Sequence, residues 1–177
     1  DIGGASDYPG TDVLTIYDST TVDVQESGLS YFHIHQFYKV LTEKGTGKLR
    51  VKIFNYEPQS AFLEIREVKI YRKEGETEVL KKSDIYDYPA PGTLILWGAR
   101  QQMAAIGHLG PGDMVEVKMF KKGYTYALLQ DEGEDKYIPP MRGHYYDIVP
   151  FWSSQHVLEK TYQTKIPLDK DLQFKFY

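Results

Sequence analysis

The sequence contains no cysteine among its 177 residues. This absence excludes disulfide bridges, a zinc site built on thiolates and a cysteine nucleophile. It leaves the redox compartment open, because a domain without cysteine folds on either side of a membrane. A chain of this length buries about 70% of its unfolded surface, so it needs neither a disulfide nor a metal to fold. We expect a single domain over residues 1–177, the N-terminal fragment of a longer protein.

The sequence also lacks a strong excess of one charge and a long apolar run. It has 21 Lys and Arg residues against 25 Asp and Glu residues, a formal net charge of -4, and the two signs are interspersed. No nucleic-acid partner is expected, because such proteins carry a concentrated basic surface. No apolar run reaches the roughly 18 residues of a transmembrane helix, so no transmembrane segment is expected in this chain.

What the sequence has is a succession of strand patterns separated by turns. Val22 and Val24 share one face at a period of two, and Ser27 with Gly28 is a turn signal that predicts a hairpin. The stretch 29–42 carries aromatic side chains on both faces, which predicts a central strand. We expect strands over residues 12–18, 20–26, 29–42, 48–56, 61–73, 93–97, 114–120, 157–166 and 172–177.

Four local features refine this pattern. The apolar positions change phase after Ile65, which predicts a β-bulge near Arg66 and Glu67. Residues 43–47 are glycine-rich and are expected to form a turn, whereas residues 99–108 favour either a strand or a turn of helix. The apolar side of the strand over 48–56 is expected to contain Leu49, Val51 and Ile53.

Short turns join these strands, and no long helix is predicted between them. This organisation is typical of antiparallel pairing. The predicted fold class is all-β, either an antiparallel β-sandwich or a strongly curved sheet, with at most one short helix.

The best metal-ligand pattern is His33 and His35. Residues two apart on a strand point to the same face, so both imidazoles could meet one cation. Zinc requires a further ligand, which the spacing does not identify, and the alternative is two polar residues on a strand face. No serine lies in a G-x-S-x-G elbow. No catalytic residue and no cofactor are therefore predicted.

A second set of candidate residues is aromatic and lies in loop-like stretches. Such residues form an exposed patch that recognises a protein or a glycan, or they close the ends of a sandwich. Both interpretations stay open at this point. The candidates for interaction are Trp97, Tyr145, Tyr146, Phe151 and Trp152.

Four segments in order carry a family resemblance. They are residues 8–12 (YPGTD), 37–45 (FYKVLTEKG), 67–75 (EVKIYRKEG) and 109–117 (LGPGDMVEV). Through them nearly the whole chain resembles the N-terminal β-domain of unknown function that precedes the transglutaminase-like domain in many bacterial cell-envelope proteins. The resemblance implies an all-β module between an export signal and a papain-like domain. It also implies an extracytoplasmic location, in the periplasm or at the cell surface.

In that family the catalytic Cys, His and Asp belong to the downstream domain, so no catalytic residue carries over to this chain. The resemblance implies a non-catalytic accessory or interaction domain whose partner is the downstream domain of the same chain, and which positions that domain or its substrate. The alternative function is a carbohydrate-binding β-sandwich module. A third hypothesis, a small metal-dependent enzyme, depends on His33 and His35.

Overall fold

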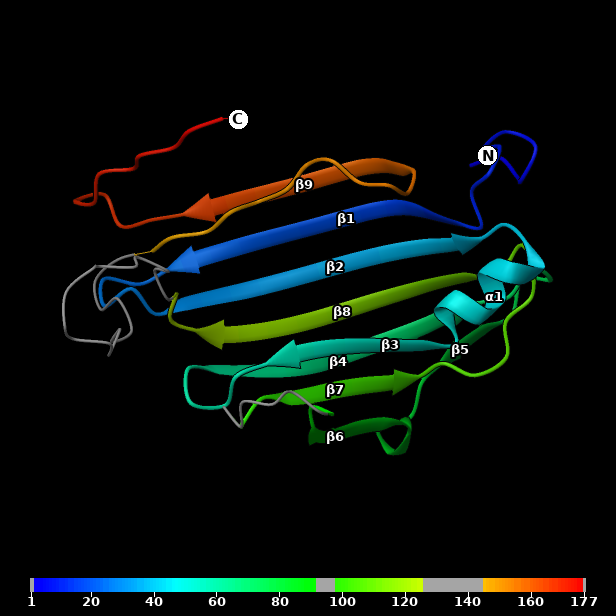
Figure 1. Cartoon of the computed structure of the whole chain (residues 1–177), viewed down its shortest axis with the longest axis horizontal. Helices are drawn as coiled ribbons and strands as arrows, with labels where there is room; N and C mark the ends of the chain where they lie inside the picture. Colours follow the sequence, from blue (N-terminus) through cyan, green and yellow to red (C-terminus); the bar gives the residue numbers. More distant parts are fainter. Residues whose placement is uncertain (1, 92–97, 126–144, 177) are drawn as a thin grey trace.

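The computed structural model describes residues 2–91, 98–125 and 145–176. Within these ranges the chain forms two sheets, one α-helix and one turn of 3-10 helix (Figure 1). The elements are β1 (Val13–Val24), β2 (Ser30–Val40), α1 (Glu43–Leu49), β3 (Val51–Tyr56), β4 (Ala61–Tyr71), β5 (Thr77–Val79), η1 (Lys82–Asp84), β6 (Ile85–Pro89), β7 (Arg100–Ala105), β8 (Met114–Gly123) and β9 (Val157–Lys165). The predicted all-β class is confirmed.

The larger sheet has six strands in the order β5-β4-β8-β2-β1-β9 (Figure 1). β1 and β2 form the predicted hairpin, in which the Gly28 amide donates to the Gln25 carbonyl at 2.8 Å and Gly28 has a φ of 81°. A positive φ is strained for residues with a Cβ, so glycine suits this turn. The stretch 29–42 becomes β2, which lies between β8 and β1 as expected of a central strand.

Two features of the larger sheet differ from or refine the sequence prediction. The two strands predicted over 12–18 and 20–26 are one strand, β1, with a register shift between Thr15 and Tyr17. β9 pairs with β1 in parallel, whereas the other pairs in this sheet are antiparallel. The predicted bulge in β4 is confirmed by the register shift between Ile65 and Glu67.

The smaller sheet has three strands in the order β3-β7-β6 and lies over β4 (Figure 1), with side chains of β8 in the core beside it. We call the face of the larger sheet toward it the inner face, and the opposite face the outer face. The core lies between the two sheets and contains Val40, Val68, Val115, Val117 and Ala104, each with 1% or less of its surface exposed. Burying these apolar side chains is the main favourable term that holds the sheets together.

The prediction of a turn over the glycine-rich stretch 43–47 is wrong. Residues 43–49 form α1, because Thr42 caps it: its Oγ1 accepts from the Gly45 amide at 3.2 Å, and its hydroxyl donates to Asp12 Oδ1 at 2.7 Å. Leu49 is 3% exposed, so the helix is also held by burial in the core. These tertiary contacts outweigh the low helix propensity of the two glycines.

The remaining predicted elements have mixed outcomes. Residues 100–105, within the stretch 99–108, form strand β7 between β3 and β6, so the short helix is α1 and not this stretch. The strand predicted over 93–97 lies outside the described residues. The strand predicted over 172–177 is wrong for residues 172–176, which lie in no strand. Among the described residues, no helix combines the length and apolar character needed to cross a membrane.

A candidate binding groove on the inner face

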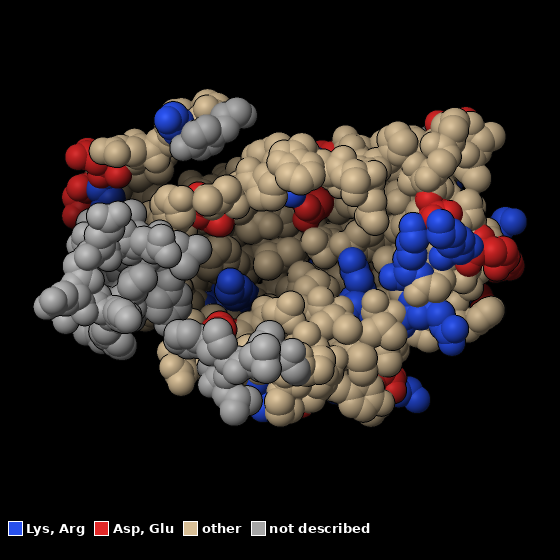
Figure 2. All heavy atoms as spheres, viewed as in Figure 1, with Lys and Arg blue, Asp and Glu red and all other residues tan. Residues whose placement is uncertain are grey.

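The two sheets are unequal, so part of the inner face has no second layer above it. The smaller sheet lies over β4, whereas the inner positions of β2, β1 and β9 continue past it. Polar side chains lie among these positions: Asp18 pairs in register with Gln36 on one side and with Lys160 on the other. Figure 2 shows this region as a hollow, with Lys and Arg side chains visible inside it. We call it the inner groove, with β2 and β1 as its floor.

Polar side chains on the floor of the groove form a connected network. The Tyr38 hydroxyl donates to Gln36 Oε1 at 2.7 Å, and Gln36 Nε2 donates to Asp18 Oδ1 at 3.2 Å. Lys160 Nζ lies 3.3 Å from Asp18 Oδ2. Burial first, and then the charge of Asp18, raises the pKa of the Tyr38 hydroxyl, which stays protonated as a donor at neutral pH. The floor is therefore a fixed hydrogen-bonding surface.

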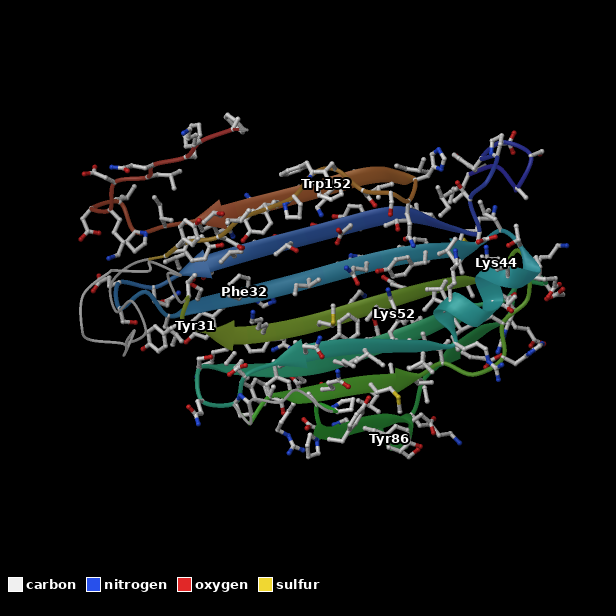
Figure 3. The ribbon with its side chains drawn as sticks, viewed as in Figure 1. Tyr31, Phe32, Lys44, Lys52, Tyr86 and Trp152 are labelled. Atoms are coloured by element: carbon white, nitrogen blue, oxygen red, sulfur yellow. The ribbon has the colours of Figure 1, made fainter. Side chains whose placement is uncertain are left out.

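Two lysines reach into the groove from opposite ends. Lys52 of β3 places its Nζ 4.0 Å from the centroid of the Tyr38 ring, and Lys121 of β8 places its Nζ 5.2 Å from that of Phe32. Figure 3 shows Lys52 and Phe32 well separated along the length of the groove. Burial lowers the pKa of Lys52, an effect that the charge of Asp18 opposes. Within the described residues neither ammonium has a hydrogen bond or an ion pair.

The start of the aromatic segment Tyr145–Trp152 forms the wall opposite β3, with Tyr146 and Asp147 in the lining. The segment is anchored at its start: the Tyr162 hydroxyl donates to Asp147, and the Tyr145 hydroxyl, which bonds to that of Tyr162, lies 3.2 Å from the same carboxylate. The Tyr145 ring also lies 6.4 Å from the Phe32 ring on the floor. Burial first, and then the hydrogen bond to Asp147, raises the pKa of Tyr162. Tyr145 is thus the side chain that fixes this wall to the floor.

The other predicted interaction residues project into solvent. Trp152 is 83% exposed, Phe151 is 62% exposed and Tyr146 is 50% exposed. Figure 3 shows Trp152 in front of β9. The structure therefore brings four of the five predicted residues together in one segment, with three of them exposed and Tyr145 half-buried. The fifth, Trp97, lies outside the described residues.

One end of the groove widens into an open cleft of about 480 Å³. The groove floor, β3 and the aromatic segment all supply residues that line this cleft. Its lining includes Phe32, Lys121, Tyr56, Tyr124, Tyr146 and Asp147. Aromatic rings next to charged groups of both signs suit a ligand that has both apolar and polar parts.

The two histidines lie elsewhere, on the outer face of β2. His35 Nε2 is 2.7 Å from Glu116 Oε1, and the Tyr71 hydroxyl donates to the other oxygen of Glu116 at 2.6 Å. His33 instead packs its ring 5.4 Å from that of Phe120. The part of the chain that the structure describes contains no group of three His, Cys, Asp or Glu residues able to hold a metal ion. The geometry thus gives each histidine a different neighbour.

Sequence reasoning missed Lys52 and Lys121 as groove residues. The predicted apolar side of this strand, with Val51 and Ile53, lies on the outside of the smaller sheet, where the two side chains are 41% and 49% exposed. The inward positions are Lys52, Phe54 and Tyr56, which are half-buried. The two aromatic residues at these alternate positions were the available signal, since aromatic rings fit a half-buried sheet surface.

The fold and the groove define a class: an all-β module of two unequal, open sheets with a groove between them. The chain belongs to the family described as a domain of unknown function with solved structure, DUF3857, whose model matches residues 26–177. No curated protein matches the sequence.

Two solved structures are similar to this chain. A "putative protease" from Parabacteroides distasonis matches at 10% identity with a TM-score of 0.59, over 66% of this chain and 24% of that one. This chain thus spans about a quarter of its length, and the likeness is one of fold. The CBM3a-L domain of a cellulosome scaffoldin from Clostridium thermocellum matches at 10% identity, over 64% of this chain and 68% of that one, and its TM-score of 0.37 carries no argument.

Proposed function

We propose that this domain is a non-catalytic accessory domain that positions a downstream transglutaminase-like domain or its substrate, on the extracytoplasmic side of the cell membrane. Three things support the proposal: membership of the DUF3857 family, the four sequence segments at residues 8–12, 37–45, 67–75 and 109–117, and the likeness in fold to a part of a much longer bacterial protein. The described residues of the groove offer charged and hydrogen-bonding groups that suit binding.

The observation that carries the proposal is the exposure of Phe151 and Trp152, at 62% and 83%. A large aromatic side chain exposed to water lacks the favourable free energy that burial would give it. Trp is also among the residues that contribute most to binding at protein interfaces. Lys160 Nζ lies 6.0 Å from the Phe151 ring, so a charged group accompanies the aromatic pair. A neighbouring protein surface would bury both rings.

A second function, binding of a carbohydrate, is favoured by one specific observation. Trp152 projects its ring beside a groove whose floor carries Gln36 and Asp18, and sugars bind to aromatic faces flanked by hydrogen-bonding groups. We argue for the protein partner, because Phe151 and Ile148 extend the exposed apolar surface of the same segment, and Ile148 is 74% exposed.

The test is made on the full-length protein that contains this chain. Phe151→Ala and Trp152→Ala are combined, and Val79→Ala is the control because Val79 is also exposed, at 59%, but lies on β5. We expect the double variant to increase amide hydrogen exchange over a contiguous surface outside this domain, and the control to leave that surface unchanged.

Two results would count against the proposal. The first is hydrogen exchange outside the domain that is the same in wild type and double variant. The second is saturable binding of a soluble polysaccharide that Trp152→Ala abolishes, which would favour the carbohydrate function instead.

A further inference from the structure

One edge of the smaller sheet is unprotected. Proteins usually protect the outer edges of their sheets with short strands, proline or charged residues. β5 has three residues, β6 ends in Pro89, and β9 carries Glu159 and Lys165. β3 has six residues without proline, pairs with β7 in a register free of shifts, and has Lys52 as its one charged residue. The outer edge of β3 faces the inner groove.

The hydrogen-bonding phase of β3 follows from a neighbouring bond. The Arg50 carbonyl accepts from the Ile106 amide at 2.9 Å, and residues of an antiparallel strand bond alternately to one side and to the other. Lys52, in phase with Arg50, therefore directs its amide and carbonyl toward β7. Ile53, like the other odd-numbered residues of β3, directs its own toward the groove. The edge presents a row of backbone donors and acceptors to any chain that enters.

The groove also offers the space that an added strand needs. A strand beside β3 would lie about 4.8 Å from it, above the part of the inner face that the smaller sheet leaves uncovered. The floor there carries the amide of Gln36 and the carboxylate of Asp18. The hollow is visible beside the smaller sheet in Figure 2. An incoming strand would become the fourth strand of that sheet.

The charges in the groove indicate which side chains an incoming strand would carry. Lys52 lies over Tyr38 and Lys121 lies over Phe32, and these two rings are six positions apart on β2. Six residues of extended chain span about 20 Å, and an even spacing puts both side chains on one face. Carboxylates six residues apart on an extended peptide would therefore reach both ammonium groups.

We propose that the inner groove binds an extended acidic peptide, which adds to the edge of β3 as a strand and places two carboxylates, six residues apart, on Lys52 and Lys121. The backbone provides affinity and the lysines provide selectivity, as in other binding by strand addition. This site goes beyond the proposed function and does not depend on it, because it uses β3 and the groove floor rather than Phe151 and Trp152.

The test uses fluorescein-labelled synthetic peptides of about nine residues, which alternate Thr and Val to favour an extended chain. The first peptide has two Glu residues six positions apart. The second has them five positions apart, so that one carboxylate points to the opposite face. The third has Lys in place of both Glu residues. Binding to the 177-residue chain is measured by fluorescence anisotropy.

We expect the first peptide to bind at least about fivefold more tightly than the second, and the third not to bind. Lys52→Met and Lys121→Met should each weaken binding of the first peptide about fivefold, and added salt should weaken it in the wild type. Lys122→Met is the matched control, because Lys122 is exposed on the outer face near Tyr31. The Phe151 and Trp152 double variant should bind the first peptide like the wild type, which separates this site from the proposed function.

Pairing of the peptide backbone with the edge of β3 is tested separately. A peptide N-methylated at alternate residues loses every amide that points to β3 in one of the two phases, and only amides that point away from β3 in the other. Methylation in the first phase should abolish binding, and methylation in the second should be tolerated. Equal affinity for the first two peptides, no binding of either, or equal effects of Lys52→Met and Lys122→Met would overturn the proposal.

Discussion

Gly45 lies against the backbone of Asp12, so closely that a Cβ atom at position 45 would stand 2.1 Å from the Asp12 carbonyl oxygen. That oxygen accepts from the Leu41 amide at 2.9 Å, so it cannot move away without loss of a hydrogen bond. Gly47, in the same helix, has no heavy atom within 4 Å of the corresponding position. The two glycines of α1 therefore have different roles.

The first prediction compares these glycines. Gly45→Ala should lower the free energy of unfolding by about 1–3 kcal/mol, the usual cost of forcing atoms into a packed site. Gly47→Ala should raise it by up to about 1 kcal/mol, because alanine is the better helix former. Urea denaturation of both variants measures the difference, and a Gly45→Ala variant as stable as the wild type would contradict the close approach.

The second prediction concerns Asp12 and pH. Hydrogen bonds from Lys48 and then from Thr42 lower the pKa of Asp12 from 3.8 to about 2. A carboxyl group whose pKa is lower in the folded state stabilises the fold above its unfolded pKa, and that stabilisation is lost as pH falls through the folded pKa. Asp12→Asn should therefore be less stable than the wild type at pH 7, and the difference should shrink between about pH 4 and pH 2.

Asp23→Asn is the control for this experiment. Asp23 is an exposed residue of β1 that accepts a hydrogen bond from Gln25 at 3.1 Å. Urea midpoints are compared for the three proteins across the acid range. A deficit of Asp12→Asn that stays constant from pH 7 to the acid limit would contradict the ion pair as its cause.

The third prediction is the titration of Lys52. Burial lowers its pKa and the negative charge of Asp18 opposes that effect, so Asp18→Asn should lower the pKa of Lys52 further. Glu26→Gln, at the hairpin end of β1, should leave it unchanged. Nuclear magnetic resonance of the lysine side chain follows the titration in each protein. An unchanged pKa in Asp18→Asn would show that the two groups do not interact across the groove floor.

The fourth prediction concerns the anchor of the aromatic segment. Tyr162→Phe removes the hydroxyl that bonds to both Tyr145 and Asp147. A hydrogen bond to a charged group contributes about 1.5 kcal/mol or more, so local opening of residues 145–149 should become roughly tenfold more frequent. Hydrogen exchange of those amides measures the change. Tyr86→Phe, at an exposed residue of β6, is the control, and equal exchange in both variants would argue against the anchor.

Several local features of this fold could be predicted from neighbouring residues alone. The hairpin depends on Gly28, whose backbone conformation suits glycine, and the bulge after Ile65 follows from a phase change that a regular strand cannot accommodate. The aromatic segment was predicted in the same way, because Tyr145 to Trp152 combine ring residues with loop-forming ones. Each prediction needed only the sequence within a few positions.

The groove could not be predicted in this way, because its parts come from distant positions in the chain. Lys52 belongs to β3 and Lys121 to β8, and what relates them is the packing of both on β2. The helix α1 was missed for the same reason, since its cap binds Asp12, thirty positions before Thr42. A contact between distant residues leaves no periodic signal in the sequence.

The sequence by itself determined the all-β class, because alternation of apolar and polar residues with glycine turns favours pleated strands whatever their neighbours are. The tertiary structure alone decided that the two sheets have unequal size, that β9 joins β1 in parallel, and that β3 has an open edge. The physical reason is that strand order and sheet packing depend on which apolar faces meet in the core, and each face can meet several partners until the whole chain has folded.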